Sequence, residues 1–336
     1  EYSNPPVYGF NRTSIDSIIN TFYIEFSYNR FNVKLGDLYE LYGRGLVFYT
    51  LQDQNVDYDN SLQGLVLKMS LMENLEISTL IGMGDYVYRS NPAFRQTDYQ
   101  MKNNVQLGSI DYETNLFGYL QFLYLNQQTQ LNPENIKNIY NDDTEIGNEL
   151  EESERTPLLM KQFILLNQGV GISDTLTSKN YNLNWDYSIG GIDIYFDKAW
   201  IQYDKIYGKD VFGSRFYTSV YTKIFDAGIT YEYKNYYTPY LIKSLSNPPI
   251  VYREGSSILS SRNVHSINFG NEIGHQIDLN RNLIGNMNIA ANLSLSHRHK
   301  MGDMDSIGLL DILSMKDEDE MYEYYPFRQI YLEMNG

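Results

Sequence analysis

Apolar and polar side chains alternate with a period of two along most of the chain. In NYNLNWDYSI (180–189), apolar side chains occupy every second position, and Asn, Asp or Ser stands between them. Because successive side chains of a strand point to opposite faces, this pattern predicts β-strands. The same period recurs near residues 21–29, 31–39, 62–71, 75–88, 104–114, 116–127, 159–169, 192–205, 213–224, 226–235, 274–281, 285–296 and 327–335. We therefore predict an all-β chain of about 14 strands without a long helix.

The predicted strands are long, and their connections alternate between short and long. Many strands span about 9–13 residues, more than the ~5–6 usual in soluble sheets but suited to a tilted strand that crosses a bilayer. Short connections are expected at 72–75, 113–115, 190–191 and 225–228, and long ones at 51–61, 89–103, 128–158, 240–273 and 300–326. This arrangement is typical of an outer-membrane barrel.

The two faces of each predicted strand differ in chemistry. In GNMNIAANLSLS (285–296), one face carries Met, Ile, Ala and Leu, whereas the other carries mainly Asn and Ser. A sheet face in bulk water is usually rich in Lys and Glu, so uncharged amides and hydroxyls indicate a polar lumen instead. We therefore expect lipid to contact the apolar face, including Leu183, Trp185, Ile289 and Leu293. The alternative is a large soluble β-protein.

The predicted fold is a transmembrane, antiparallel, up-and-down β-barrel that occupies residues 1–336 as a single domain. The N-terminus lacks both an initiator Met and a signal-peptide pattern, so we interpret the chain as a processed or truncated piece with a barrel incomplete at its termini. Acidic side chains concentrate in two segments, near 128–158 and 300–326, which we expect to be long, solvated loops.

Composition narrows the function classes. The chain has 42 acidic and 26 basic residues and a net charge of −16, which argues against binding to nucleic acid. Because Cys is absent, disulfides, thiolate zinc sites and cysteine nucleophiles are excluded. The 32 tyrosines favour strands with surfaces that are part apolar and part wet. No apolar run approaches the ~18–20 residues that a transmembrane helix needs.

The stretch VKLGDLYELYGRGLVFYTLQDQNVDYDNSLQGLVLK (33–68) is the most distinctive in the chain. It resembles a family of Bacteroidota-type outer-membrane β-barrels without an assigned function. The resemblance rests on GDLYELYGRGL and DNSLQG, with matching residues Gly36, Tyr39, Glu40, Gly43, Gly45, Leu46, Asp59, Asn60, Ser61, Leu62 and Gly64. It implies an outer-membrane barrel and brings no catalytic residues. The chain departs from such barrels in its ending, EMNG, which is not an aromatic-terminated strand.

The first of these motifs supplies the candidate site residues, Glu40, Gly43, Arg44 and Gly45. The two glycines permit positive φ or a close backbone approach. Glu40 and Arg44 are four residues apart, so a turn could join them as an ion pair inside the lumen. The motif is then either a turn clamped by a salt bridge or a pore constriction that contacts a ligand.

Other chemistry is weakly indicated. His297 and His299 share a strand face, which suits interface anchoring better than metal binding. Acidic clusters at 141–145 and 302–306 do not match a calcium-binding loop. Enzymatic signatures such as GxSxG, HExxH or a P-loop are absent. We therefore expect no catalytic residues, no metal and no cofactor.

The expected location is the cell outer membrane, with the lipid bilayer as the main partner. The expected role is a passive channel for small solutes or a scaffold for envelope proteins. Two alternatives stay open: a soluble secreted β-protein that binds glycans, through aromatic segments such as 233–240, and an outer-membrane hydrolase that uses His265 or His275.

Overall fold

A computed structural model describes residues 22–53, 58–88, 99–130, 175–206, 209–238, 245–251, 271–282, 287–299, 324 and 326–335. Thirteen of its strands form one antiparallel sheet, in which each pairs with the next long strand along the chain. They are β1 (Tyr23–Tyr28), β2 (Phe31–Leu38), β7 (Leu62–Met72), β8 (Leu75–Tyr88), β9 (Tyr99–Thr114), β10 (Gly118–Gln130), β11 (Thr175–Ile189), β12 (Ile192–Ile206), β13 (Lys209–Ile224), β14 (Ala227–Tyr237), β15 (Asn271–Asn282), β16 (Asn288–His297) and β17 (Phe327–Asn335). The prediction of an all-β, antiparallel, up-and-down fold is confirmed.

Four strands of two residues each lie between β2 and β7. They are β3 (Leu41–Tyr42), β4 (Phe48–Tyr49), β5 (Gln52–Asp53) and β6 (Tyr58–Asp59), paired as β3 with β4 and β5 with β6. The described part of the chain contains no helix long and apolar enough to cross a membrane.

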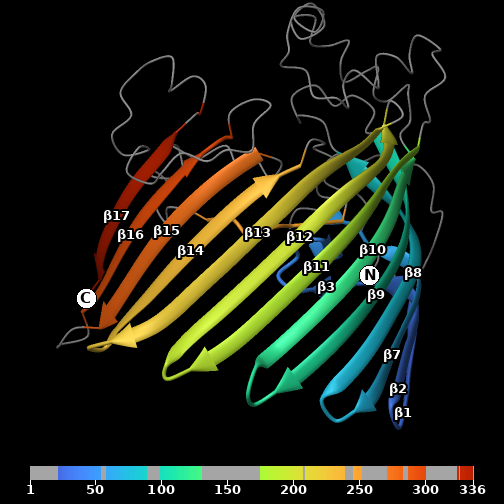
Figure 1. Ribbon diagram of the computed structural model, residues 1–336, viewed down its shortest axis with the longest axis horizontal. Helices are drawn as coiled ribbons and strands as arrows, with labels where there is room; N and C mark the ends of the chain where they lie inside the picture. Colours follow the sequence, from blue (N-terminus) through green and yellow to red (C-terminus); the bar gives the residue numbers. More distant parts are fainter. Residues whose placement is uncertain are drawn as a thin grey trace, which may run out of the picture.

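Short turns join consecutive strands at one end of the strands (Figure 1). The turn between β11 and β12 consists of Gly190 and Gly191, whose φ values of 59° and 82° match the twist of a two-residue hairpin. The turns between β7 and β8 and between β13 and β14 are equally short. The predicted short connections at 72–75, 190–191 and 225–228 coincide with these turns, and the one at 113–115 lies up to two residues before the β9–β10 turn at 115–117.

The sheet curves strongly, and the segment that carries β3 lies inside the curve (Figure 1). On the concave face, alternate side chains are buried, and many are polar: Asn180, Asn182 and Asn184 of β11 are 6%, 2% and 1% exposed. On the opposite, convex face, large apolar side chains stay accessible, including Ile110, Phe122 and Trp200. The polarity of the two faces is thus the reverse of that in a soluble sheet.

Some of the predicted strands and loops differ in number or bounds, or lie beyond the described residues. The main sheet has 13 strands where about 14 were predicted, and the strand expected at 159–169 falls outside the described part. β10 continues to Gln130, so the first residues of the expected 128–158 loop belong to a strand. The remainder of that loop and most of 300–326 lie outside the described residues. The single-domain assignment stays a prediction.

Candidate functional site in the concave face

Residues 39–50 form a segment that folds onto the concave face instead of continuing the sheet (Figure 1). Its apolar side chains Leu46, Val47 and Phe48 are 1%, 6% and 0% exposed. They belong to one apolar cluster with inward-facing residues of several strands, among them Leu80, Val105, Leu107, Leu123 and Leu125. Burial of this apolar area holds the segment in the interior, and we call it the inner segment.

The predicted ion pair between Glu40 and Arg44 is wrong, because the two side chains have different partners. Glu40 pairs with Lys34 of β2 and Lys68 of β7, at 3.4 and 3.0 Å. Arg44 Nη1 donates hydrogen bonds to the Tyr217 hydroxyl at 3.1 Å and to Ser219 Oγ at 3.2 Å. The guanidinium carbon of Arg44 also lies 4.0 Å from the centroid of the Tyr195 ring. Glu40 therefore fixes one end of the inner segment, and Arg44 links its tip to β13.

Both glycines of the motif adopt the left-handed conformation that the sequence suggested. Gly43 has φ of 58° and Gly45 has φ of 77°. A Cβ at Gly43 would lie 2.7 Å from the side-chain amide of Asn184, so the segment makes a close approach to β11 there. That amide is itself within hydrogen-bonding distance of Gln121, Asn182, Tyr195 and Asp197.

A second inward stretch, residues 245–251, holds the inner segment from the other side. The Tyr49 amide donates to the Leu245 carbonyl at 2.7 Å, and the Asn247 amide donates to the Gly45 carbonyl at 3.0 Å. Buried Arg215 of β13 bridges both stretches, donating to the Leu46 carbonyl at 2.7 Å and to Ser246 Oγ at 2.8 Å. Charged hydrogen bonds of this kind, shielded from water, are among the stronger ones in proteins.

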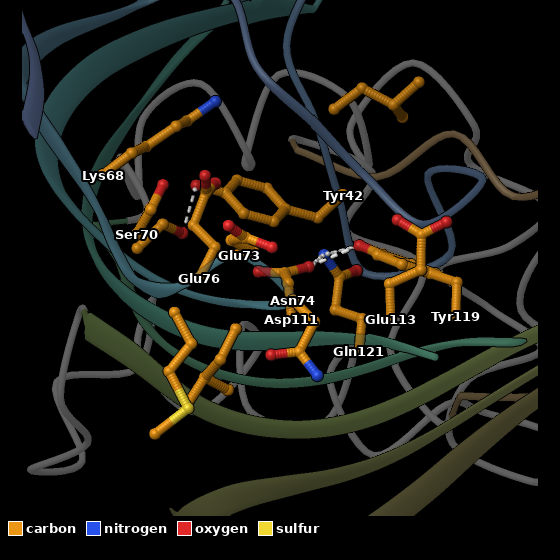
Figure 2. Close-up of a pocket in the computed structure, with 14 residues that line it drawn as sticks. Tyr42, Lys68, Ser70, Glu73, Asn74, Glu76, Asp111, Glu113, Tyr119 and Gln121 are labelled. Atoms are coloured by element: carbon orange, nitrogen blue, oxygen red, sulfur yellow. Dashed lines mark hydrogen bonds between the residues drawn. The ribbon is translucent and has the colours of Figure 1, made fainter. Parts of the chain in front are cut away.

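Beside the inner segment, a cavity of about 360 Å³ lies between β7, β8, β9 and β10, next to the short turns. Figure 2 shows its labelled side chains turned toward a common space, with the ring of Tyr42 among them. The carboxylates of Glu73, Glu76, Asp111 and Glu113 line this cavity. Its cationic side chain is Lys68. We call this cavity the acidic chamber.

The carboxylates of the chamber differ in how they are held. Asp111 accepts hydrogen bonds from Ser109 at 2.7 Å and from the side chains of Tyr119 and Gln121. Among the described residues, by contrast, none forms an ion pair or hydrogen bond with the carboxylate of Glu73 or Glu113, and both side chains are exposed. Their negative charge therefore acts on whatever occupies the chamber.

Tyr42 joins the inner segment to the chamber wall. Its hydroxyl lies 3.2 Å from Ser78 Oγ, which in turn lies 2.8 Å from Ser109 Oγ. Burial raises the pKa of the Tyr42 phenol above its ordinary value, so the hydroxyl stays protonated and available as a donor at neutral pH. The chamber is thus bounded by the inner segment on one side and by the sheet on the other.

The side chains predicted to face lipid lie on the convex face. Leu183 and Trp185 alternate with the buried asparagines of β11, and Ile289 and Leu293 alternate with buried side chains of β16. All four are partly exposed. Contact with lipid itself stays a prediction for these residues.

The profile of the "Family of unknown function (DUF6029)" matches residues 1–335. The chain belongs to this family. The lack of an assigned function agrees with the predicted resemblance, whereas the link to Bacteroidota and the motifs GDLYELYGRGL and DNSLQG stay predictions. No curated protein matches this DUF6029 chain with significance.

Several solved structures resemble this member of DUF6029 at low similarity. OccK10 (OpdN) of Pseudomonas aeruginosa has a TM-score of 0.45 and 9% identity, over 84% of this chain and 68% of that one. OprD of the same organism has a TM-score of 0.42 and 12% identity, over 84% and 60%. A BenF-like porin from Pseudomonas fluorescens Pf-5 has a TM-score of 0.40 and 8% identity, over 93% and 71%. Because these TM-scores are below 0.5, we argue function from this chain's own geometry.

The sequence did not single out the acidic chamber, although it contains a signal for it. Glu73 and Glu76 lie in or beside one predicted short turn, and Asp111 and Glu113 lie beside or in the next. Short turns at the same edge of a meander are neighbours, so these acids could have been placed together. Within the described residues, no three His, Asp or Glu side chains are arranged to hold a metal ion.

Proposed function

We propose that this member of DUF6029 is an outer-membrane β-barrel protein that acts as a passive channel for small solutes, with the inner segment as its constriction. The supporting observation is the inverted polarity of the sheet. The concave face buries asparagines, serines and threonines beside the apolar cluster under the inner segment, and the convex face carries accessible Ile, Leu, Phe and Trp side chains. Hydrocarbon stabilises such a convex face, whereas water penalises it.

The constriction is supported by the position of Arg44. This side chain is exposed although it lies on the concave face, between Tyr195, Tyr217 and Ser219. Aqueous space therefore reaches the tip of the inner segment. Solutes would pass the acidic chamber on one side of this segment, and the carboxylates there favour cations over anions.

The decisive experiment is a recording from planar bilayers that contain the full chain. We expect stepwise ion conductance with a preference for K⁺ over Cl⁻ in a salt gradient. The double substitution Glu73→Gln and Glu113→Gln should lower the cation-to-anion permeability ratio about two- to fivefold, because screened charges within ~8–10 Å of a permeating ion contribute at that level. The matched control is Asp226→Asn, because Asp226 is an exposed acid in the β13–β14 turn, at the same end of the strands as the chamber.

The outcomes separate the alternatives. Recovery of a monodisperse protein from buffer without detergent would contradict a membrane location and favour a soluble β-protein. A silent bilayer that contains correctly folded protein would contradict the channel. It would favour a closed scaffold for envelope proteins, the second candidate, which the apolar packing of Leu46 and Phe48 against β8, β9 and β10 supports.

A further inference from the structure

A groove of about 400 Å³ crosses the convex face between β12, β13 and β14. It is lined by alternate residues of these three strands, the ones that point away from the concave face, and by His299. His299 is 2% exposed, and its ring nitrogens lie 3.0 Å from Asn235 Oδ1 and 2.6 Å from Asn271 Oδ1. The groove therefore has one wall fixed by hydrogen bonds and opens on the side that the proposed function assigns to lipid.

Lys198 contributes a cation to this groove, and it has no acidic partner among the described residues. Its Nζ lies 5.9 Å from the ring centroids of both Trp200 and Phe216. Among the described residues, none forms an ion pair or hydrogen bond with this ammonium group. On the same convex face, Lys179 of β11 instead pairs with Asp204 at 2.6 Å.

Lys198 lies one outward position from Trp200, within reach of the border of an apolar belt. The outward residues of β12 begin with Ile192, Ile194 and Phe196 next to the short turn, and they continue with Lys198, Trp200 and Gln202. The outward side chains thus change from apolar to polar and amphipathic at Lys198. A lysine at such a border extends its ammonium group toward the headgroup region, where phosphates lie.

Resting on the proposed function, we propose that this groove binds the phosphate of an anionic phospholipid headgroup. Lys198 Nζ supplies the charge, and the Ser214 hydroxyl and the Asn235 amide supply hydrogen-bonding groups in the same groove. The rings of Trp200 and Phe216 provide apolar contact for the glycerol backbone and the first acyl carbons. Charge complementarity selects an anionic lipid over a zwitterionic one, because a choline group would bring a second cation close to Lys198.

Native mass spectrometry of the full chain in detergent micelles tests this site. The probes are phosphatidylglycerol and phosphatidylcholine at equal concentration, with inorganic phosphate as a competitor. We expect the wild-type chain to retain phosphatidylglycerol about fivefold over phosphatidylcholine, the effect of one lysine beside an anionic lipid surface. Lys198→Gln should remove this preference, and Lys179→Gln, on the same face, should keep it.

Three results would overturn the site: equal retention of both lipids by the wild-type chain, an unchanged preference in Lys198→Gln, or displacement of the lipid by inorganic phosphate at the same concentration. Heat-dependent gel mobility and bilayer conductance, measured on the same preparations, separate this failure from that of the proposed function. A chain that inserts and conducts but lacks lipid preference loses the lipid site alone. A chain that does not insert loses both.

Discussion

The two tryptophans of the chain provide a direct test of lipid contact, because both lie on the convex face at different heights. Trp185 lies opposite Phe196 in the pairing of β11 with β12, so Trp200 is four positions further along β12. With a rise of ~3.3 Å per residue and a strand tilt of ~40°, this separation corresponds to about 10 Å along the membrane normal.

The depth of each indole follows from its neighbours. Trp200 lies opposite Tyr181. The next outward residue of β11 beyond Tyr181 is the charged Lys179, so this level is the border of the apolar belt. Trp185 lies about 10 Å closer to the short turns, within a belt that in such proteins is ~25 Å tall. Its indole reaches the turn between β9 and β10. The Trp185 indole donates to the Phe117 carbonyl at 2.7 Å, which satisfies a group that hydrocarbon would otherwise leave without an acceptor.

The assay uses Trp185→Phe and Trp200→Phe, which leave one fluorophore each, in vesicles of brominated phosphatidylcholine. We expect bromines on the acyl chains to quench both indoles, because both rings lie on the convex face. Aqueous iodide should quench neither indole efficiently. Strong quenching by iodide without quenching by brominated lipid would refute lipid contact.

Two further predictions concern stability and use matched pairs of substitutions. Phe122 lies on the apolar part of the convex face of β10, and Phe122→Arg should lower the free energy of unfolding by about 2–4 kcal/mol in lipid vesicles. Gln128 faces outward near the far end of the same strand, and Gln128→Arg should change this free energy by less than ~1 kcal/mol. Similar urea midpoints for the two variants would contradict a hydrocarbon belt. Gly43→Ala and Gly190→Ala impose the same strain, since φ is 58° and 59°, but only Gly43 has a close neighbour. Each substitution should lower the free energy of unfolding by about 1–2 kcal/mol because alanine disfavours the left-handed conformation. Gly43→Ala should lower it by about 1–3 kcal/mol more, because its Cβ displaces the buried side-chain amide of Asn184. Equal losses of stability in urea would show that the inner segment does not depend on its close approach to β11.

The strands and their faces could be predicted because each depends on residues close in sequence. Alternation alone assigned Leu183 and Trp185 to one face and the intervening asparagines to the other, and the structure has this arrangement. Register follows from short turns such as Gly190–Gly191, which leave little freedom in pairing. Local rules therefore account for most of the sheet.

The partners in the interior could not be predicted, since they depend on contacts between distant strands. Spacing suggested that Glu40 would meet Arg44, but the chain turns between them at Gly43 with positive φ. Glu40 is left beside Lys34 and Lys68 of two neighbouring strands, and Arg44 reaches Tyr217, 173 residues away. Only the pairing of β2 with β7 and the curvature of the whole sheet bring these groups together.

The direction of the edge strands predicts how a barrel built from this sheet closes. All pairs in the sheet are antiparallel and it has 13 strands, so β1 and β17 run in the same direction. Antiparallel closure therefore needs an odd number of strands beyond the 13, which gives the even total usual for bacterial barrels.

Cysteine pairs test this closure, because the chain contains no native cysteine. Ile24→Cys on β1 should form no disulfide with cysteine placed in turn at Ile330, Leu332 or Met334 of β17, since at least one strand, ~4.8 Å wide, separates the two edges. Phe122→Cys with Leu183→Cys, which lie directly opposite each other in the pairing of β10 with β11, should oxidise readily as the control. A disulfide between β1 and β17 would show that the sheet closes on itself through a parallel pair, and the argument from strand parity would then fail.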